Sequence, residues 1–199
     1  MSGDDIRVRP LAEADWDGVA ALESRTYAGL GLSEGRAALE SRGRVSPGTC
    51  FALVQGPRLA GYVLALPYPL FRYPDLERAE AAAVKSARPS NLHLHDLVVE
   101  QGLRHRGLGG RLLRHLTATA RSCGYERISL LAVGGSEPFW SAQGFAVQEG
   151  VVPLGYGPGA AYMSRAVRAG GPDAGATRDG RAEPTGPPGG PSSRKETCC

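Results

Sequence analysis

The chain has 199 residues, which is enough for one domain with a substantial core and a tail. Its hydrophobic content of 42% and charged content of 22% are those of an ordinary soluble globular protein. The net charge of +3 is too small to indicate a nucleic-acid-binding surface, and no apolar run approaches the roughly 18 residues that a membrane span needs.

The two ends of the chain carry no strong targeting pattern. Residues 1–10 lack the basic-then-apolar order of a signal peptide. Two of the four cysteines are the last two residues, and the spacing of the four suits no metal site. We therefore expect a reduced, cytoplasmic protein whose partners include neither nucleic acid nor a membrane.

The composition changes sharply after Val167. Residues 168–199 contain no Val, Ile, Leu, Met, Phe, Tyr or Trp and are rich in Gly, Pro and Ala. Such a segment buries too little apolar surface to offset the entropy lost on ordering. We predict a folded domain over residues 1–167 and a disordered C-terminal tail over residues 168–199.

The first half of the domain alternates between predicted strands and helices. In chain order these are a strand over residues 6–10, helices over 13–27 and 33–43, and a hairpin of strands over 49–55 and 59–67. Gly43 is expected to end the second helix, because glycine is a common helix stop. Gly56 and Pro57 provide the turn of the hairpin.

The second half continues the alternation. The pattern predicts a connecting segment with an alanine-rich helix over residues 70–88, followed by a strand over 91–99 and a helix over 107–124. A buried strand over 127–133, a short helix over 136–143, and closing strands over 144–150 and 160–167 complete the prediction. Leucines at helical spacing give the helix over 107–124 one apolar face. The expected fold class is α/β (α+β), with a mixed, mostly antiparallel sheet flanked by helices.

Three glycines, Gly107, Gly109 and Gly110, separate the strand over residues 91–99 from the leucine-rich helix. Glycines let the backbone approach a ligand closely, and the free N–H groups of a first helical turn suit a pyrophosphate. Neither the Walker pattern nor the dinucleotide fingerprint is present. The local sequence leaves a phosphate loop and a plain glycine-rich connection as equal alternatives. The basic residues that would add charge at the rim are Arg104, Arg106 and Arg111.

The strand before this loop contains two histidines. Period-two geometry predicts that His93 and His95 project from one face and Asp96 from the other. No third ligand lies at convincing spacing, so we predict no metal. The alternative to a catalytic role is two hydrogen-bonded histidines in a half-buried strand.

Two segments resemble the GCN5-related N-acetyltransferase (GNAT) superfamily. The run from Arg104 to Gly109, RHRGLG, matches its R/Q-x-x-G-x-G/A motif, and the run from Phe139 to Phe145, FWSAQGF, resembles its F-Y-x-x-x-G-F segment. The resemblance covers about residues 6–167. It implies that the loop amides hold the pyrophosphate of coenzyme A, and that the preceding strand splays from its neighbour and pairs with the pantetheine arm. The cofactor-binding residues that it implies are Leu97, Val98, Val99, Arg104, His105, Arg106, Gly107, Leu108, Gly109, Gly110, Arg111, Ser136 and Trp140.

The His-Leu-His strand is similar to that of the serotonin (arylalkylamine) N-acetyltransferases. This resemblance implies that His93 and His95 relay a proton off an amine, a role that suits a side chain with a pKa near 6.5. Asp96, the third candidate catalytic residue, either attracts the ammonium group or serves as a hydrogen-bond partner. We expect acetyl-CoA as co-substrate, direct transfer to a small-molecule primary amine in a ternary complex, and a homodimer as one allowed state. A backbone amide at Val98 or Val99 would stabilise the thioester oxyanion.

The sequence departs from the family at Trp140, where relatives carry a tyrosine that protonates the leaving thiolate. Indole is no acid near neutral pH, so Tyr156, Tyr162 or solvent would replace it, and we expect the Trp140 ring to pack beneath the cofactor sulfur. Ser136 is expected to cap the following short helix or to contact the cofactor. The departure leaves a degenerate acyl-CoA sensor as an alternative. A protein or peptide N-acetyltransferase is a further alternative, because the sequence shows no specific chemistry for the acceptor. Aromatic residues expected near the acceptor are Tyr27, Tyr68, Phe71 and Tyr73.

Overall fold

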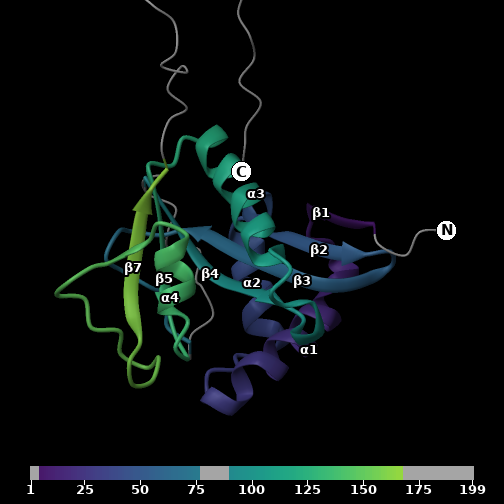
Figure 1. The fold of residues 1–199 in the computed structure, drawn as a ribbon, viewed down its shortest axis with the longest axis horizontal. Helices are drawn as coiled ribbons and strands as arrows, with labels where there is room; N and C mark the ends of the chain where they lie inside the picture. The colour runs from purple at the N-terminus through teal and green to yellow at the C-terminus, as the bar shows by residue number, and fades with distance from the viewer. Residues whose placement is uncertain (1–4, 77–89, 168–199) are drawn as a thin grey trace, which may run out of the picture.

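A computed structural model describes residues 5–76 and 90–167 of the chain (Figure 1). Within these residues seven strands form one sheet in the order β1-β2-β3-β4-β5-β7-β6. Neighbouring strands are antiparallel except for the parallel pair β4 and β5. The predicted fold class, a mixed and mostly antiparallel sheet flanked by helices, is confirmed.

The elements follow the predicted order closely. The strands are β1 (Ile6–Pro10), β2 (Phe51–Gln55), β3 (Arg58–Pro67), β4 (Asn91–Val99), β5 (Arg127–Ala132), β6 (Ala146–Val147) and β7 (Ala161–Ala166). The α-helices are α1 (Trp16–Tyr27), α2 (Arg36–Val45), α3 (Leu108–Ser122) and α4 (Glu137–Ala142). The predicted closing strand over residues 144–150 shortens to the two residues of β6. Most of the predicted alanine-rich helix and the whole predicted tail lie outside the described residues.

Two apolar clusters lie on opposite faces of the sheet. The predicted apolar face of α3 is buried in the first cluster, where it packs on Leu92 and Leu94 of β4. Helices α1 and α2 supply the second cluster, which includes Tyr62 and Leu64 of β3. Because side chains of a strand alternate between faces, the central strands β3 and β4 are buried on both sides. This packing fixes the position of β4, the strand that carries the histidines.

Gly43 does not end α2, contrary to the prediction. The helix continues to Val45, and a Cβ atom at Gly43 would lie only 2.4 Å from the Trp16 ring. The glycine is therefore explained by close packing between α1 and α2 rather than by a helix stop.

Strand β4 has two irregularities that shape the site. It pairs with β5 only from Asn91 to Leu94, and beyond that point it stays on β3 while β5 stays on β7. The register with β3 also shifts, since Leu94 lies opposite Ala65 but Asp96 lies opposite Leu64. His95 is the extra residue of a β-bulge, which reverses the alternation of faces beyond it.

Candidate active site

A cavity of about 650 Å³ lies where β4 and β5 separate. This volume is in the range of small-molecule and cofactor sites. Both strands, the glycine loop and α4 line it. Of the predicted cofactor-binding residues, all but Arg106 and Arg111 line this cleft; those two side chains are exposed outside it.

The separation leaves backbone groups of β4 facing the cleft. The Glu100 N–H donates to the Ala60 carbonyl at 2.9 Å, so alternate residues of β4 are bonded to β3. By this alternation Val98 points its N–H toward β3, whereas Leu97 and Val99 point theirs toward the gap. The Val99 carbonyl accepts a hydrogen bond from Nε of Arg104 at 3.1 Å, which ties the loop to the strand.

The glycine loop turns into α3 through two left-handed residues. Gly107, the N-cap of α3, has φ 73°, and His105 has φ 63°. A Cβ atom at Gly109 would lie 3.4 Å from Phe139 and 3.5 Å from Leu97, so the backbone passes close to both side chains. The first N–H groups of α3 have no acceptor within the helix, and the helix dipole adds positive potential there. The cleft thus ends at a helix N-terminus suited to a phosphate group.

Helix α4 closes another side of the cleft. Trp140 is 7% exposed, lines the cleft, and packs against the rings of Phe139 and Phe145 with centroids 4.9 and 5.5 Å away. Ser136 is the N-cap residue of α4, as predicted, but its side chain makes no capping hydrogen bond to the helix. Its hydroxyl instead accepts a hydrogen bond from the Val133 N–H at 3.2 Å. Both residues are therefore part of the wall of the cleft.

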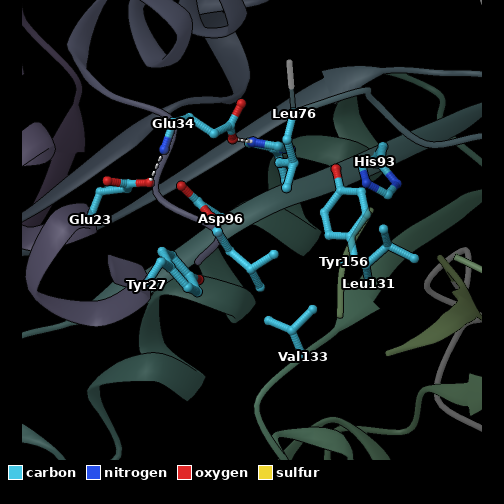
Figure 2. A pocket seen from close by; sticks show the side chains of 11 residues that line it. Glu23, Tyr27, Glu34, Leu76, His93, Asp96, Leu131, Val133 and Tyr156 are labelled. Carbon is cyan, nitrogen blue, oxygen red and sulfur yellow. Dashed lines mark hydrogen bonds and ion pairs between the residues drawn. The ribbon is translucent and has the colours of Figure 1, made fainter. Parts of the chain in front are cut away.

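A second, small cavity of about 30 Å³ opens beside the cleft (Figure 2). It has room for about two water molecules. In Figure 2 the carboxyl groups of Glu23 and Asp96 lie toward one another, the carboxyl group of Glu34 extends away from them, and His93 and Tyr156 lie on the other side. The residues that line both cavities are Tyr27, His95, Leu131 and Val133. The two cavities therefore meet at His95.

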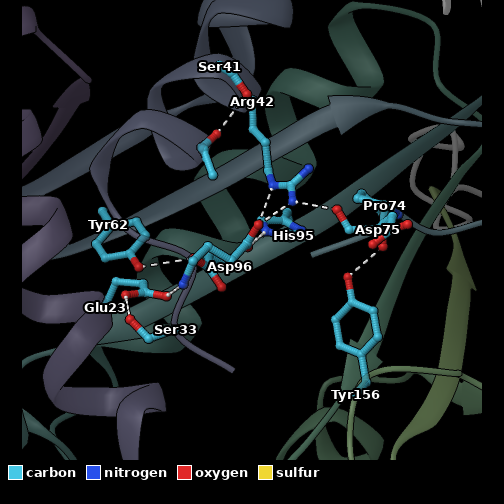
Figure 3. A network of polar contacts seen from close by, with 12 residues as sticks. Glu23, Ser33, Ser41, Arg42, Tyr62, Pro74, Asp75, His95, Asp96 and Tyr156 are labelled. Carbon is cyan, nitrogen blue, oxygen red and sulfur yellow. Dashed lines mark hydrogen bonds and ion pairs between the residues drawn. The ribbon is translucent and has the colours of Figure 1, made fainter. Parts of the chain in front are cut away.

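His95 is held by a chain of buried charges (Figure 3). Its Nε2 lies in hydrogen-bond contact with Oε1 of Glu34, and the other oxygen, Oε2, accepts from Nε of Arg42 at 2.9 Å and also from Nη2. Arg42 also donates from Nη2 to the carbonyl of Asp75 at 3.0 Å. Burial works against the charge of Glu34, but His95 and Arg42 together outweigh it and hold the pKa of Glu34 below its usual value.

His93 has a different environment. Its Nδ1 lies 3.0 Å from the Ser129 hydroxyl, and its ring stacks on Tyr162 with centroids 6.3 Å apart. Burial, with smaller contributions from His95 and Arg42, holds the pKa of His93 well below its usual value. His93 is therefore neutral near pH 7.

Asp96 lies on the same side of the sheet as His93, so the prediction that it faces the opposite side is wrong. The bulge at His95 is the cause, because it shifts the alternation by one residue. Oδ2 of Asp96 accepts a hydrogen bond from the Tyr62 hydroxyl at 3.1 Å. Burial raises the pKa of Asp96 despite the opposing effect of His95.

Glu23 is the third acidic group of the small cavity. It is 1% exposed and accepts hydrogen bonds of 2.7 Å from the Ser33 hydroxyl and from the Glu34 N–H. These donors are neutral. The cavity is therefore acidic, since Arg42 is the one arginine or lysine of the described residues that contacts its carboxylates.

The tyrosines considered as acids occupy different places. Tyr156 lines the small cavity, but its hydroxyl donates to the Pro74 carbonyl at 2.7 Å, and burial raises its pKa. Tyr162 lines neither cavity, and its hydroxyl accepts from the Phe71 N–H at 3.0 Å. Among the four aromatic residues expected near the acceptor, only Tyr27 lines either cavity.

Sequence reasoning missed Glu23, Glu34, Arg42 and Tyr62. Arg42 had a signal, since it follows Leu39 by three residues on the buried face of α2. Nothing in the local sequence distinguishes Glu34.

No group of three His, Cys, Asp or Glu side chains in residues 5–76 and 90–167 could hold a metal ion. No helix in these ranges is long and apolar enough to cross a membrane.

Comparison with known proteins gives the same fold. N-acetylglutamate synthase from Neisseria gonorrhoeae, complexed with coenzyme A and N-acetyl-glutamate, is 18% identical with a TM-score of 0.63, over 84% of this chain and 36% of that one. The GphF GNAT-like decarboxylase in complex with isobutyryl-CoA is 24% identical with a TM-score of 0.62, over 81% of this chain and 100% of that one. The ribosomal-protein-S18-alanine N-acetyltransferase from Escherichia coli is 16% identical with a TM-score of 0.55, over 84% of this chain and 97% of that one.

These identities show the fold alone, and no curated protein matches the chain. The sequence itself matches the Acetyltransferase (GNAT) family over residues 16–145, which is more than half of its length. The chain therefore belongs to the GNAT family of acyl-CoA-dependent acyltransferases.

Proposed function

We propose that this protein transfers an acetyl group from acetyl-CoA to a small primary amine, with an arylalkylamine as the first choice of acceptor. The observation that carries the proposal is the meeting of two cavities at His95. One is a long cleft suited to a phosphate-bearing cofactor, and the other is a small acidic cavity with two histidines. Direct transfer requires such adjacency, since amine and thioester must come into contact.

The cleft fits coenzyme A at both ends. The first turn of α3, opened by Gly107, is suited to a pyrophosphate, and Arg104 and His105 line the same end. The backbone groups of Leu97 and Val99 that face the gap would pair with the amides of the pantetheine arm. Bound there, acetyl-CoA would supply an acetyl thioester as the group to be transferred.

Of the two amides considered as oxyanion donors, Val99 is the better candidate. Its N–H points toward the cleft, whereas that of Val98 points toward β3. A fixed N–H near the thioester oxygen would stabilise the negative charge that develops there. Trp140 lines the same cleft without an acidic proton, so the proton for the departing thiolate would come from the amine or from solvent.

The small cavity suits a cationic amine. Glu23 and Asp96 are buried and hydrogen-bonded by neutral donors, so they would favour an ammonium group at the mouth of the cavity. Tyr27 and Leu131 provide apolar surface at the same place, which favours an aromatic or aliphatic chain on the amine. His95 lines both cavities and would accept the proton that the amine loses before it attacks the thioester. His93 lines only the small cavity.

The test is a coenzyme A release assay over a panel of amines that includes tryptamine, polyamines, aminoglycosides and peptides. We expect turnover with a small arylalkylamine. The double variant His93→Ala/His95→Ala should lose roughly 10²- to 10⁴-fold in kcat and still bind coenzyme A by calorimetry. His115→Ala is the matched control, because His115 packs on Phe51 and lines neither cavity.

Two outcomes would replace the proposal. Coenzyme A binding without turnover of any amine would indicate an acyl-CoA sensor. Turnover restricted to peptides would indicate a protein N-acetyltransferase, the activity in the name of the Escherichia coli neighbour.

A further inference from the structure

Glu34 joins His95 to Arg42 through its two separate oxygens (Figure 3). Oε1 contacts His95 and Oε2 contacts Arg42. The side chains of His95 and Glu34 are each 3% exposed, and that of Arg42 is 0% exposed. Water therefore competes little for these hydrogen bonds, and each carboxylate oxygen has a fixed partner.

The donors and acceptors in this chain determine where the protons lie. A guanidinium only donates hydrogen bonds, and an ionised carboxylate only accepts them. The Glu34 side chain is ionised because Arg42 and His95 outweigh the effect of its burial. His95 must therefore donate from Nε2, so in its neutral form the lone pair lies on Nδ1. Among residues 5–76 and 90–167, none forms a hydrogen bond with Nδ1.

We propose that Glu34 is a positioning residue that holds His95 in the Nε2-protonated tautomer, so that Nδ1 is the atom that accepts the proton of the acceptor amine. Arg42 fixes the orientation of the Glu34 carboxylate. The tautomer is a property of the protein without substrates. The role of Nδ1 rests on the proposed function, because the proton comes from the amine.

The amine nitrogen loses two protons during the reaction. The ammonium group gives one proton to Nδ1, which later passes to solvent, and the freed lone pair forms the C–N bond to the acetyl carbon. The C–S bond breaks as the amide forms, and the second proton lost by nitrogen ends on the coenzyme A thiolate. Glu34 gives up no proton and gains none. Its contribution is to keep Nδ1 free before the amine arrives.

Other ionisable groups around His95 come from several neighbouring elements. They are Glu23 and Tyr27 of α1, Glu34 before α2, Arg42 of α2, Tyr62 of β3, His93 and Asp96 of β4, and Tyr156 before β7. Only Glu34 has a hydrogen bond to the imidazole of His95. The other carboxyl groups act on it through space alone, so substitution of Glu34 should affect the tautomer most directly.

The variant Glu34→Gln should reverse the tautomer. Arg42 only donates, so the new amide must turn its oxygen toward Arg42 and its NH₂ group toward His95. His95 would then accept at Nε2 and carry its proton on Nδ1. Long-range ¹H–¹⁵N spectra of ¹⁵N-histidine-labelled protein report the tautomer directly, and the chain has only four histidines.

The kinetic readout separates positioning from folding. We expect Glu34→Gln to lower kcat by roughly 10²-fold or more while the KM for acetyl-CoA changes little. Glu40→Gln is the matched control: Glu40 pairs with Arg36 and Arg44 on the outer side of α2 and lines neither cavity.

The inference is overturned if the wild-type protein shows His95 protonated on Nδ1, or if Glu34→Gln leaves both the tautomer and kcat unchanged in a protein that acetylates an amine. A tautomer that switches as expected in a protein that acetylates no amine would instead contradict the proposed function, and with it the role of Nδ1 as proton acceptor. A switched tautomer with a matching loss of kcat supports both.

Discussion

The two cavities of this protein are built in opposite ways. The large cleft includes three backbone features: the open edge of β4, a tight glycine loop and the first turn of α3. The small acidic cavity is formed by side chains that converge from α1, the segment before α2, β4, β5 and the loop before β7. A backbone site depends on conformation and tolerates many side chains. A cavity of buried charges depends on each partner, since a single unpaired charge is costly.

The largest expected effect lies in the acidic cavity. Arg42→Met should lower the free energy of unfolding by about 3–5 kcal/mol, because the buried Glu34 carboxylate would lose its cationic partner. Urea unfolding followed by circular dichroism measures the loss. Arg44→Met is the control, since its side chain is 66% exposed and the expected change is within about 0.5 kcal/mol. Equal free energies of unfolding for Arg42→Met and the wild type would mean that the buried Glu34 carboxylate does not depend on Arg42.

The next effect tests the backbone side. Gly107→Asp should weaken coenzyme A binding by roughly 10- to 100-fold, because it adds a side chain at φ 73° and a negative charge at the phosphate end. Calorimetry with coenzyme A provides the measurement. Gly102→Asp adds the same charge in a nearby exposed turn that does not line the cleft. Equal affinities of the two variants for coenzyme A would contradict the assignment of the phosphate site to this loop.

The difference between the cavities matters for what sequence alone predicts. The residues of the loop from Arg104 to Gly110 are contiguous in the chain. Its glycine spacing and its place between a strand and a helix are therefore visible in the sequence and indicate a candidate phosphate loop. The contact between His95 and Glu34 spans 61 residues along the chain, and no local pattern encodes it. The bulge at His95 was equally hidden, because strand periodicity assumes an unbroken register. Gly43 was misinterpreted since a glycine that ends a helix and one that admits a neighbouring ring look alike in sequence.

A smaller effect is expected from pH. Burial lowers the pKa of His93 in the folded protein, so below about pH 6.5 the unfolded chain binds the proton more readily and stability falls with falling pH. Between pH 7.5 and 5.5 the slope contributed by His93 should reach at most about 1.4 kcal/mol per pH unit. The measurement is urea unfolding across this range. His93→Gln should flatten the curve, and an unchanged slope in that variant would assign the dependence to another group.

The smallest effect concerns residues 170–199. Deletion of residues 170–199 should leave the melting temperature and the affinity for coenzyme A nearly unchanged, because that segment contains no large apolar residue. Scanning calorimetry and titration calorimetry of the truncated and full chains make the comparison. A drop of several degrees in the melting temperature would show that the segment contributes to the fold.

The bulge in β4 also separates the strand into two independently adjustable halves. Upstream of His95 the strand is fixed on both edges, by β3 and by β5; downstream it is fixed on one edge and free on the other. The inserted residue at this junction lets the side chains upstream of His95 alternate independently of those downstream. Side chains around residues 91–96 can therefore change between related proteins while the backbone that faces the cleft at Leu97 and Val99 stays as it is.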